Sequence, residues 1–512
     1  MRHRAQMRTA IEPLVDSFRS ATAFAVFLLL ATINAIRTLR HEMWHDELQA
    51  FMLAAGSPTL VDLFHNLKYE GHPGLWHALL WIVTRFTTDP IAMQVLHLAI
   101  ALVIWILIFT ISPFTIGEKV LLVLSYFLFW EYFVISRNYA LMALLGLGFV
   151  ALRASWPRQL FLPWLLLGLL ANTVVLGTIW SMTMAIFFAF RVRRRSLPFL
   201  LGGMTYVFLL VIAVATMMPA PDMTRYQWGG TGSLVAFPFH SFIPLVPPWL
   251  SETILWIGDP HVAQLSNFDP AEVLIWLLHI DLGHPARWIL ILISPIAFCW
   301  FVIRDLVRTA EFAMGYIGVL LFAQLWHFSG DVRHHGIVFV MLVGVAWATR
   351  AAVTASDRRA WRWMPMLLVA AMGGLATLSS ELHPYSQGRN LALWLERNRM
   401  NDGPIMGSVD YTVATIAGYL RRPVYYLECE CLGTFIVWNG QRQMLNSQEI
   451  ISRVTHALEI FGWTDAVLIL NRQLTQQQEI SASHVLFQPL ERFSGAVGQP
   501  EENYVVYRVR MY

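Results

Sequence analysis

The chain has 512 residues, of which 56% are apolar and only 13% are charged. Soluble domains average about 45–50% apolar and about 25% charged residues. This composition, with a mean hydropathy of +0.53, therefore indicates a protein that crosses the membrane several times. The net charge of +3 is small and no basic patch interleaves with aromatic residues, which argues against a nucleic-acid partner.

The N-terminal segment is basic, with Arg2, Arg4, Arg8 and Arg19, and the first long apolar run follows it at 20–39. A cleaved signal peptide would have a similar pattern. Because further apolar runs follow and an acidic loop begins directly after the first one, we predict an uncleaved membrane helix.

Eleven apolar runs are long enough, or nearly so, to cross a bilayer, since a spanning helix needs about 20 residues. They are 20–39, 91–112, 118–135, 138–153, 160–175, 176–190, 197–218, 286–303, 311–328, 335–349 and 363–379. The division of 160–190 into two spans has the weakest support in the sequence.

Basic residues are placed at alternate ends of these runs. They are Lys119, then Arg153 and Arg158, then Arg191, Arg193, Arg194 and Arg195, then Arg304 and Arg308, then Arg350, Arg358, Arg359 and Arg362. Positive residues accumulate on the cytoplasmic side of membrane proteins. We therefore predict a cytoplasmic N-terminus, with the first loop and the C-terminal region outside the membrane. We expect a bacterial inner membrane and a periplasmic C-terminal domain.

The first external loop, 40–90, has the pattern of helices that lie on the membrane surface. Ser57-Pro58 is typical of a helix start, and it precedes an apolar stripe of Leu60, Leu63, Phe64 and Leu67. A second stripe consists of Leu75, Leu79, Ile82 and Phe86. We predict two amphipathic juxtamembrane helices here.

A second external loop, 219–285, is rich in Pro, Trp and His, and loops of this length are usually binding surfaces or lids. We therefore divide the chain into a transmembrane domain, 1–379, which carries both external loops, and an extracytoplasmic domain, 380–512.

In residues 380–512, helical segments alternate with strand-like ones, which predicts a small α/β domain. The helical segments are 388–400, 411–420 and 447–461, and the strand-like ones are 404–409, 424–427, 435–438, 466–470 and 504–509. Cys429 and Cys431 form a C-x-C pair that is too isolated for a four-ligand metal site; a strained local disulfide is the alternative, and two free thiols are expected. The fold class is thus an α-helical polytopic membrane protein with about eleven transmembrane helices and a small C-terminal α/β soluble domain.

Acidic residues gather in the first external loop. Trp44-His45-Asp46-Glu47 follows the first span, and Tyr69-Glu70-Gly71-His72-Pro73 precedes the second amphipathic stripe. An isolated Asp at a helix start is often only a solvated cap. Here a carboxylate in a water-restricted site can accept the proton of an attacking hydroxyl. A second carboxylate and a histidine can bind a divalent metal ion or position a phosphate through one. Glu70 and His72 are the candidates for this role.

These two motifs resemble the first external loop of the GT-C class of integral-membrane glycosyltransferases, in particular the protein O-mannosyltransferase and lipid A aminoarabinose transferase group. Ser136-Arg137-Asn138-Tyr139-Ala140-Leu141 is similar to that group's R-x-Y-A-L segment. The order of spans, surface helices and terminal α/β domain also resembles the group. The likeness covers the whole chain in layout but only three short segments in residues.

The resemblance implies an inverting, single-displacement transfer from a polyprenyl-phosphate-sugar donor on the outer side of the membrane. The acceptor would be a hydroxyl of a lipid, polysaccharide or protein. Asp46 would act as the catalytic base, next to Glu47, while Glu70 and His72 would hold a metal or the donor phosphate.

Arg137, Tyr139, Arg333 and His334 are further candidates for substrate binding. A guanidinium binds phosphate in a bidentate manner, although an arginine at the interface can also simply extend to water. His334 and the adjacent His335 carry less weight, because single histidines at an interface are more often structural.

Two alternatives from other classes remain open. His41-Glu42-Met43-Trp44-His45 matches H-E-x-x-H, which on a helix presents two imidazoles to zinc and a glutamate as the base of a metalloprotease. No third histidine follows at metzincin spacing. A lipid or solute transporter without catalysis is the other alternative, but no internal repeat is evident and the charged residues concentrate at the outer face.

Overall fold

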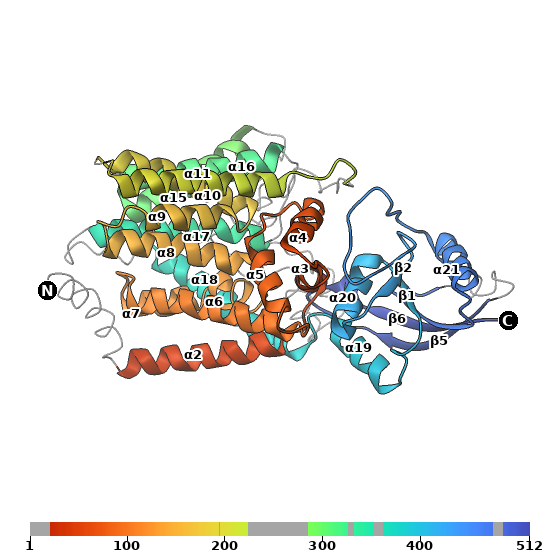
Figure 1. Ribbon diagram of the computed structural model, residues 1–512. Helices are drawn as coiled ribbons and strands as arrows, with labels where there is room; N and C mark the ends of the chain where they lie inside the picture. The colour runs from red at the N-terminus through yellow and green to blue at the C-terminus, as the bar shows by residue number, and fades with distance from the viewer. Residues whose placement is uncertain (1–20, 194, 224–284, 326–331, 353–361, 475–484) are drawn as a thin grey trace.

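The computed structural model describes residues 21–193, 195–223, 285–325, 332–352, 362–474 and 485–512. A bundle of roughly parallel and antiparallel helices forms one half of the molecule, and a smaller α/β domain is attached to one end of the bundle (Figure 1). The helices of the bundle are α2 (Ala21–Arg40), α6 (Ile91–Thr110), α7 (Ile116–Val123), α8 (Asn138–Ser155), α9 (Leu162–Ala171), α10 (Val175–Arg191), α11 (Leu197–Met217), α15 (Pro285–Ile303), α16 (Leu306–Leu325), α17 (Val332–Ala352) and α18 (Met364–Ala376).

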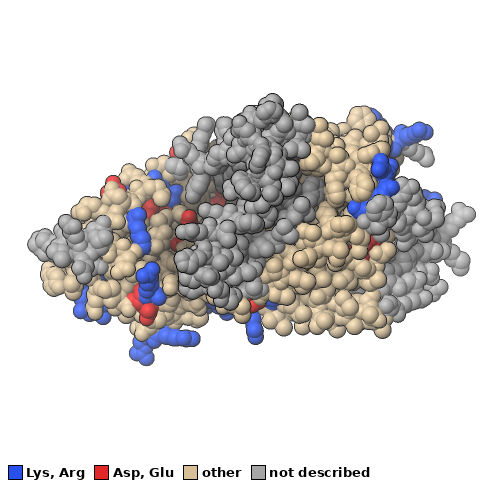
Figure 2. Space-filling model, turned by 180° about the vertical axis from the view of Figure 1, so that it is seen from behind, with Lys and Arg blue, Asp and Glu red and all other residues tan. Residues whose placement is uncertain are grey.

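Within the described residues, six of these helices are long and apolar enough to cross a membrane: α2, α6, α8, α11, α16 and α17. The surface of α11 carries a row of exposed large apolar residues, among them Leu200, Met204, Phe208 and Val211. On the face shown in Figure 2, the middle of the bundle bears almost no charge, and Lys and Arg gather at its end. The exposed apolar residues would be unfavourable in water. The chain is therefore an integral membrane protein, which confirms the expected fold class.

The predicted span 118–135 is wrong as one continuous helix. Helix α7 ends at Val123, and a short π-helix, η2 (Phe127–Glu131), follows it. Helix α18 crosses at the break, where Gly374 lies directly on the carbonyl group of Leu124, so that any side chain at position 374 would clash with it. A long apolar run can therefore be interrupted where a neighbouring helix packs against free backbone groups. The remaining predicted spans match helices, although α9 is short and α16 begins at Leu306.

The first external loop folds into α3 (His45–Ala55), α4 (Leu60–Asn66), a 3-10 turn η1 (Leu67–Tyr69) and α5 (Leu75–Thr84). The predicted cap at Ser57-Pro58 is displaced, because α4 is capped by Thr59, whose hydroxyl accepts from the N–H of Asp62. Leu63, Leu67, Trp76 and Leu80 are fully buried. Leu63 and Leu67 of the first predicted stripe thus pack onto the protein, whereas α5 buries Trp76 and Leu80 and leaves Ile82 and Phe86 of the second predicted stripe exposed. This packing holds the loop rigidly at the end of the bundle.

The C-terminal domain is a six-stranded mixed sheet with the order β3-β2-β1-β4-β6-β5. Its strands are β1 (Ile405–Ser408), β2 (Val424–Tyr426), β3 (Cys431–Gly433), β4 (Asp465–Leu470), β5 (Val485–Phe493) and β6 (Tyr504–Met511). β1 is parallel to β2 and β4, and the other pairs are antiparallel. Helices α19 (Gly388–Arg397) and α20 (Asp410–Leu420) cover one face, and α21 (Ser447–Phe461) covers the other.

Four details of this domain differ from the sequence predictions. The segment 435–438 is not a strand, β3 lies a few residues earlier, and β5 was not predicted. β5 was missed because Pro489 and the polar residues Gln488, Glu491 and Arg492 interrupt its apolar alternation. Cys429 and Cys431 are joined in a disulfide rather than being free thiols.

The face of α20 packs against the first external loop (Figure 1). Gly418 lies against Leu48 of α3, and the hydroxyl of Tyr419 donates to the carbonyl of Met43 over 3.0 Å. The catalytic candidates of the first loop are therefore enclosed between the bundle and the C-terminal domain. The predicted second external loop lies almost entirely outside the described residues.

Candidate functional site

Asp46 is the centre of a charged cluster at the junction of bundle and C-terminal domain. It lies in the first turn of α3, while Arg137 precedes α8 and Arg333 lies in the first turn of α17. Its Oδ2 atom is 2.7 Å from Nη1 of Arg137 and 3.3 Å from Nη2 of Arg333. The Asp46 side chain remains 27% exposed. One accessible carboxylate thus holds two guanidiniums from helices far apart in the sequence.

The charge of Asp46 is strongly stabilised. Burial alone would raise its pKa, but Arg137 and Arg333, with smaller contributions from His45 and His72, hold the pKa well below the usual value of 3.8. An opposite charge within a few ångströms favours the ionised form. Asp46 is therefore an anion at every physiological pH. It becomes a better proton acceptor only when another anion takes over the guanidiniums.

Trp44, in the first external loop, contacts both arginines with its ring. Its ring is 5.1 Å from the guanidinium carbon of Arg333 and 6.0 Å from that of Arg137. A flat aromatic ring attracts guanidinium groups through its negative face. The indole N–H of Trp44 is buried and has no hydrogen-bond partner in the part of the chain that the structure describes. Trp44 belongs to the acidic motif of the first loop, but its residue type alone gave no indication of this contact with the arginines.

Glu47, a catalytic candidate by sequence, has a structural position instead. Its side chain is fully buried. One oxygen accepts from the backbone N–H of Ser136 over 2.6 Å, and the other lies 2.9 Å from Nε2 of His41 and accepts from the N–H of Trp44. Both carboxylate oxygens of Glu47 thus have hydrogen-bond partners inside the protein. Glu47 therefore fixes the start of α3 and the segment before α8, and its burial does not support the predicted catalytic role, which stays a prediction.

Glu70 and His72 lie beside Asp46, as predicted. Burial raises the pKa of Glu70 to about 7, a hydrogen bond from Gln49 opposes this rise, and the charge of Asp46 adds to it. Burial and the nearby charge of Arg137 lower the pKa of His72 to about 4. His72 is thus neutral near pH 7, and its Nδ1 atom has no partner among the described residues. Glu70 is the carboxyl group of this site that titrates near neutrality.

The raised pKa of Glu70 has a consequence for stability. Between about pH 4.5 and pH 7 the unfolded chain releases this proton while the folded chain keeps it, so the free energy of unfolding falls as the pH rises. We expect the wild-type protein to lose thermal stability from about pH 5 to about pH 8. The variant Glu70→Gln should lose less, because Gln cannot ionise. Tryptophan fluorescence melting at both pH values measures this difference.

The matched control is Glu396→Gln, which removes an exposed carboxyl group on α19. It should have the same pH dependence as the wild-type protein. Equal pH dependence in Glu70→Gln and the wild-type protein would contradict a raised pKa at position 70.

A divalent metal ion at Glu70 and His72 stays a prediction. Among the described residues, no group of three His, Cys, Asp or Glu side chains gathers in a way that could hold a metal ion. One oxygen of Glu70 is occupied by the amide of Gln49 at 2.7 Å. These two residues therefore do not form a complete metal site by themselves.

His45 links Asp46 to the C-terminal domain. Its Nδ1 atom and its backbone N–H both lie within 2.9 Å of Oε1 of Glu502, and Nε2 lies 3.6 Å from Oδ1 of Asp46. Glu502 is fully buried and also accepts from Thr415 and Ser386. A buried carboxylate therefore orients the imidazole towards Asp46. Glu502 was missed because it is 457 residues away in the sequence.

Gln49 forms a second link between the site and the C-terminal domain. Its amide exchanges two hydrogen bonds with the backbone of Ile436, at 2.8 and 2.7 Å, and its NH₂ group also donates to Glu70. The bonds to Ile436 fix which way the amide points, so Gln49 always presents a donor to Glu70. The segment around Ile436 in the C-terminal domain is thereby coupled directly to the site.

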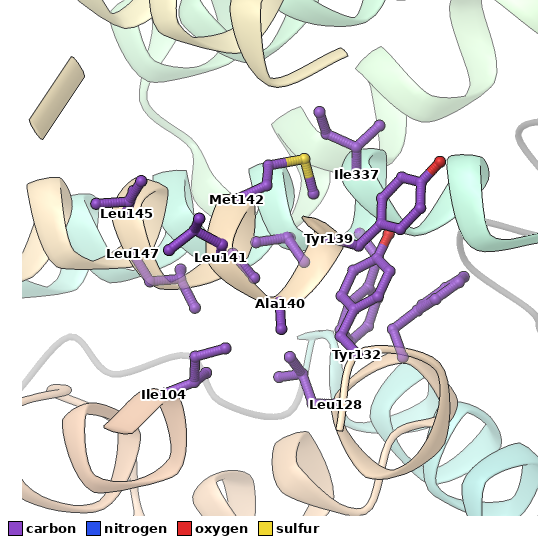
Figure 3. Packing of buried hydrophobic residues seen from close by; sticks show 14 of the residues in the cluster. Ile104, Leu128, Tyr132, Tyr139, Ala140, Leu141, Met142, Leu145, Leu147 and Ile337 are labelled. Carbon is purple, nitrogen blue, oxygen red and sulfur yellow. The ribbon is translucent and has the colours of Figure 1, made fainter. Parts of the chain in front are cut away.

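Tyr139 and His334 lie buried in the helix bundle next to the site. Tyr139 is almost fully buried, stacks on Tyr132 and meets the ring of His334 edge-on at 5.5 Å. Figure 3 shows the rings of Tyr132 and Tyr139 side by side in the core. The hydroxyl of Tyr132 donates to the carbonyl of Arg333 over 2.7 Å. In the structure these residues position Arg333 and do not line an open surface.

The H-E-x-x-H segment does not form one helical face. Helix α2 ends at Arg40 and α3 begins at His45, so the first histidine is outside a helix. His41 contacts Glu47, His45 contacts Glu502, and Glu42 accepts from the backbone of Tyr385. A zinc site of this type needs both imidazoles on one side of a continuous helix. The segment does not meet this requirement, which argues against the protease alternative.

Comparison with known proteins gives one similar structure to report. The chain is similar to ArnT from Cupriavidus metallidurans, in a crystal structure of the apo state. The identity is 14%, the TM-score is 0.43, and the match covers 96% of this chain and 98% of that one. No family model matches the chain, and no curated protein matches it.

Proposed function

We propose that the protein is a membrane glycosyltransferase that moves a sugar from a polyprenyl-phosphate donor to an acceptor hydroxyl at the outer face of the membrane. The observation that carries this proposal is the cluster of Asp46, Arg137 and Arg333. An accessible carboxylate lies against two guanidiniums, at the end of an apolar helix bundle. Such a site offers a base for a hydroxyl and cations for a phosphate, next to a bilayer that can supply a lipid.

The arginines suit a phosphate that approaches from the membrane. Both lie at the starts of bundle helices, and guanidiniums bind phosphate in a bidentate manner. The donor phosphate would draw Arg137 and Arg333 away from Asp46. This exchange removes the positive charges that hold the pKa of Asp46 low. Donor binding would therefore prepare the base for its reaction.

The transfer can be written as a single displacement. Asp46 accepts the proton of the acceptor hydroxyl while the hydroxyl oxygen forms a bond to the anomeric carbon of the sugar. The bond between this carbon and the phosphate oxygen breaks, and its electron pair leaves with the lipid phosphate. Arg137 and Arg333 stabilise the charge that develops there. His45, oriented by Glu502, keeps the Asp46 carboxylate in place.

The C-terminal domain would contribute to the acceptor side of the site. Tyr411 packs its ring 5.2 Å from that of His45, and Trp438 stacks on Tyr411 at 6.2 Å. Aromatic faces of this kind are suited to a sugar ring or another flat apolar surface. The bonds of Ile436 to Gln49 place this aromatic pair at the same junction as Asp46.

A photo-crosslinking polyprenyl phosphate tests the proposal without knowledge of the sugar. The full-length protein is reconstituted in lipid nanodiscs, irradiated with the probe and analysed by peptide mass spectrometry. We expect labelling of peptides that contain the start of α3, the start of α8 or the start of α17. Excess unlabelled polyprenyl phosphate should suppress this labelling, while a polyprenyl alcohol of equal length should not. Labelling spread evenly over the lipid-facing helices would contradict the proposal.

A further inference from the structure

A cavity of about 230 Å³ lies at the opposite end of the bundle from Asp46. Its walls come from the ends of α8, α10 and α17 and from the first turns of α16. Exposed Lys and Arg side chains gather at this end of the molecule (Figure 2). By charge placement this end faces the cytoplasm. The cavity is therefore separate from the transferase site and near the other membrane surface.

The mouth of the cavity carries three arginines and one glutamate. Nη1 of Arg191 and Nη1 of Arg308 lie 2.9 and 2.8 Å from the same oxygen of Glu311. Arg153 donates to the carbonyls of Pro157 and Gln159 and lies over the ring of Phe188. Among the described residues that line this cavity, positive charge thus exceeds negative charge by two. The site has the electrostatic character of an anion-binding site.

The deeper part of the cavity is apolar. It is lined by Val150, Trp180, Met341 and Gly344. Met341 lies 11 residues before the end of α17, which corresponds to about 16 Å along the helix. A small ion bound at the mouth would leave the apolar part of the cavity unfilled. A ligand with a charged head and an apolar chain would fill both parts.

We infer that this cavity binds the phosphodiester headgroup of an anionic phospholipid, with one acyl chain in the apolar part. Basic pockets between transmembrane helices at the cytoplasmic side are suited to anionic headgroups. Guanidiniums provide several donors in a fixed plane for phosphate oxygens. The headgroup would compete with Glu311 for Arg191 and Arg308. The lipid would then join α8, α10, α16 and α17 at their cytoplasmic ends.

Native mass spectrometry of the purified full-length protein tests this inference. The probes are phosphatidylglycerol and phosphatidylcholine with identical acyl chains. Both lipids carry the same phosphodiester, but phosphatidylcholine adds a quaternary ammonium to a mouth that already has an excess of positive charge. We therefore expect the wild-type protein to retain phosphatidylglycerol at least about tenfold more than phosphatidylcholine, because placing like charges side by side is unfavourable. Arg308→Gln should lower retention about tenfold. Glu311→Gln should raise it, because the competing carboxylate is removed.

Two further variants complete the test. Ala348→Trp places a large ring in the cavity and should abolish phosphatidylglycerol retention while the mouth keeps its charges. Arg193→Gln removes an equal charge from an exposed position that does not line the cavity, and it should have no effect.

Three results would overturn the inference. They are equal retention of both lipids by the wild-type protein, equal losses in Arg193→Gln and Arg308→Gln, and full displacement of the lipid by soluble glycerol phosphate at equal concentration. The last result would identify a site for a free phosphate instead. None of these outcomes depends on the transferase activity.

Discussion

Replacement of Asp46 by Asn is expected to lower the transfer rate by about 10²–10⁴-fold, the range in which general bases contribute to catalysis. Binding of the donor should be preserved or become tighter. The Asp46 carboxylate contacts both guanidiniums that the donor phosphate would need, so its removal frees Arg137 and Arg333. The melting temperature should fall, because Arg137 and Arg333 lower the pKa of Asp46 in the folded protein, so that its ionised carboxylate stabilises the fold at neutral pH. Release of free polyprenyl phosphate and binding of the phosphate probe measure the two effects separately.

The combination of lost turnover and retained binding distinguishes a base from other roles. If Asp46→Asn also lost donor binding, Asp46 would hold the donor rather than the acceptor proton. Glu42→Gln is the control, because Glu42 precedes the same helix and, among the described residues, its hydrogen bond comes from the backbone N–H of Tyr385. It should retain full transfer activity. A protease of the H-E-x-x-H type would instead depend on Glu42.

Replacement of Arg137 by Gln is expected to raise the dissociation constant of the polyprenyl phosphate probe by about 10–100-fold, since hydrogen bonds to charged groups contribute about 1.5–3 kcal/mol. Arg137→Lys should recover only part of the affinity, because an ammonium group cannot bind in a bidentate manner. Arg333→Gln should behave similarly. Binding of the probe to protein in nanodiscs measures these changes.

The same variant should also move the pH profile of transfer. Arg137 is the first of the groups that hold the pKa of Asp46 low, so its removal raises that pKa. The acidic limb of kcat/KM should shift towards neutral pH in Arg137→Gln. Arg389→Gln is the control, because Arg389 is a half-buried arginine at the same end of the bundle whose hydrogen bond, among the described residues, goes to the carbonyl of Arg40. An unchanged acidic limb in Arg137→Gln would separate Asp46 from the proton transfer.

The sequence alone was sufficient for the membrane class, for most helices and for the location of the charged site. Apolar runs of about 20 residues have few stable alternatives to a helix in a bilayer, because every backbone polar group must be paired. Asp46 and Arg333 were selected by residue type and position at helix ends, and Arg137 by its place in the segment that resembles the GT-C group. The structure places Asp46 and both arginines in direct contact.

The tertiary structure was needed to assign roles within that site. Asp46 and Glu47 are neighbours, and successive side chains on a helix point about 100° apart. Only the packing of α3 on the bundle determined that Asp46 remains accessible while Glu47 is buried against Ser136. No local pattern distinguishes the two carboxylates. The same packing interrupted the predicted span 118–135 where α18 crosses it.

Long-range contacts decided the rest. Glu502 reaches His45, and Ile436 reaches Gln49, across several hundred residues. Arg153, Arg191 and Arg308 were read in the sequence as separate markers of topology, yet they converge on one cavity. A sequence records which side chains lie at the end of each helix. The arrangement of helices in the bundle determines which of these ends meet, because that choice depends on the packing of the whole chain.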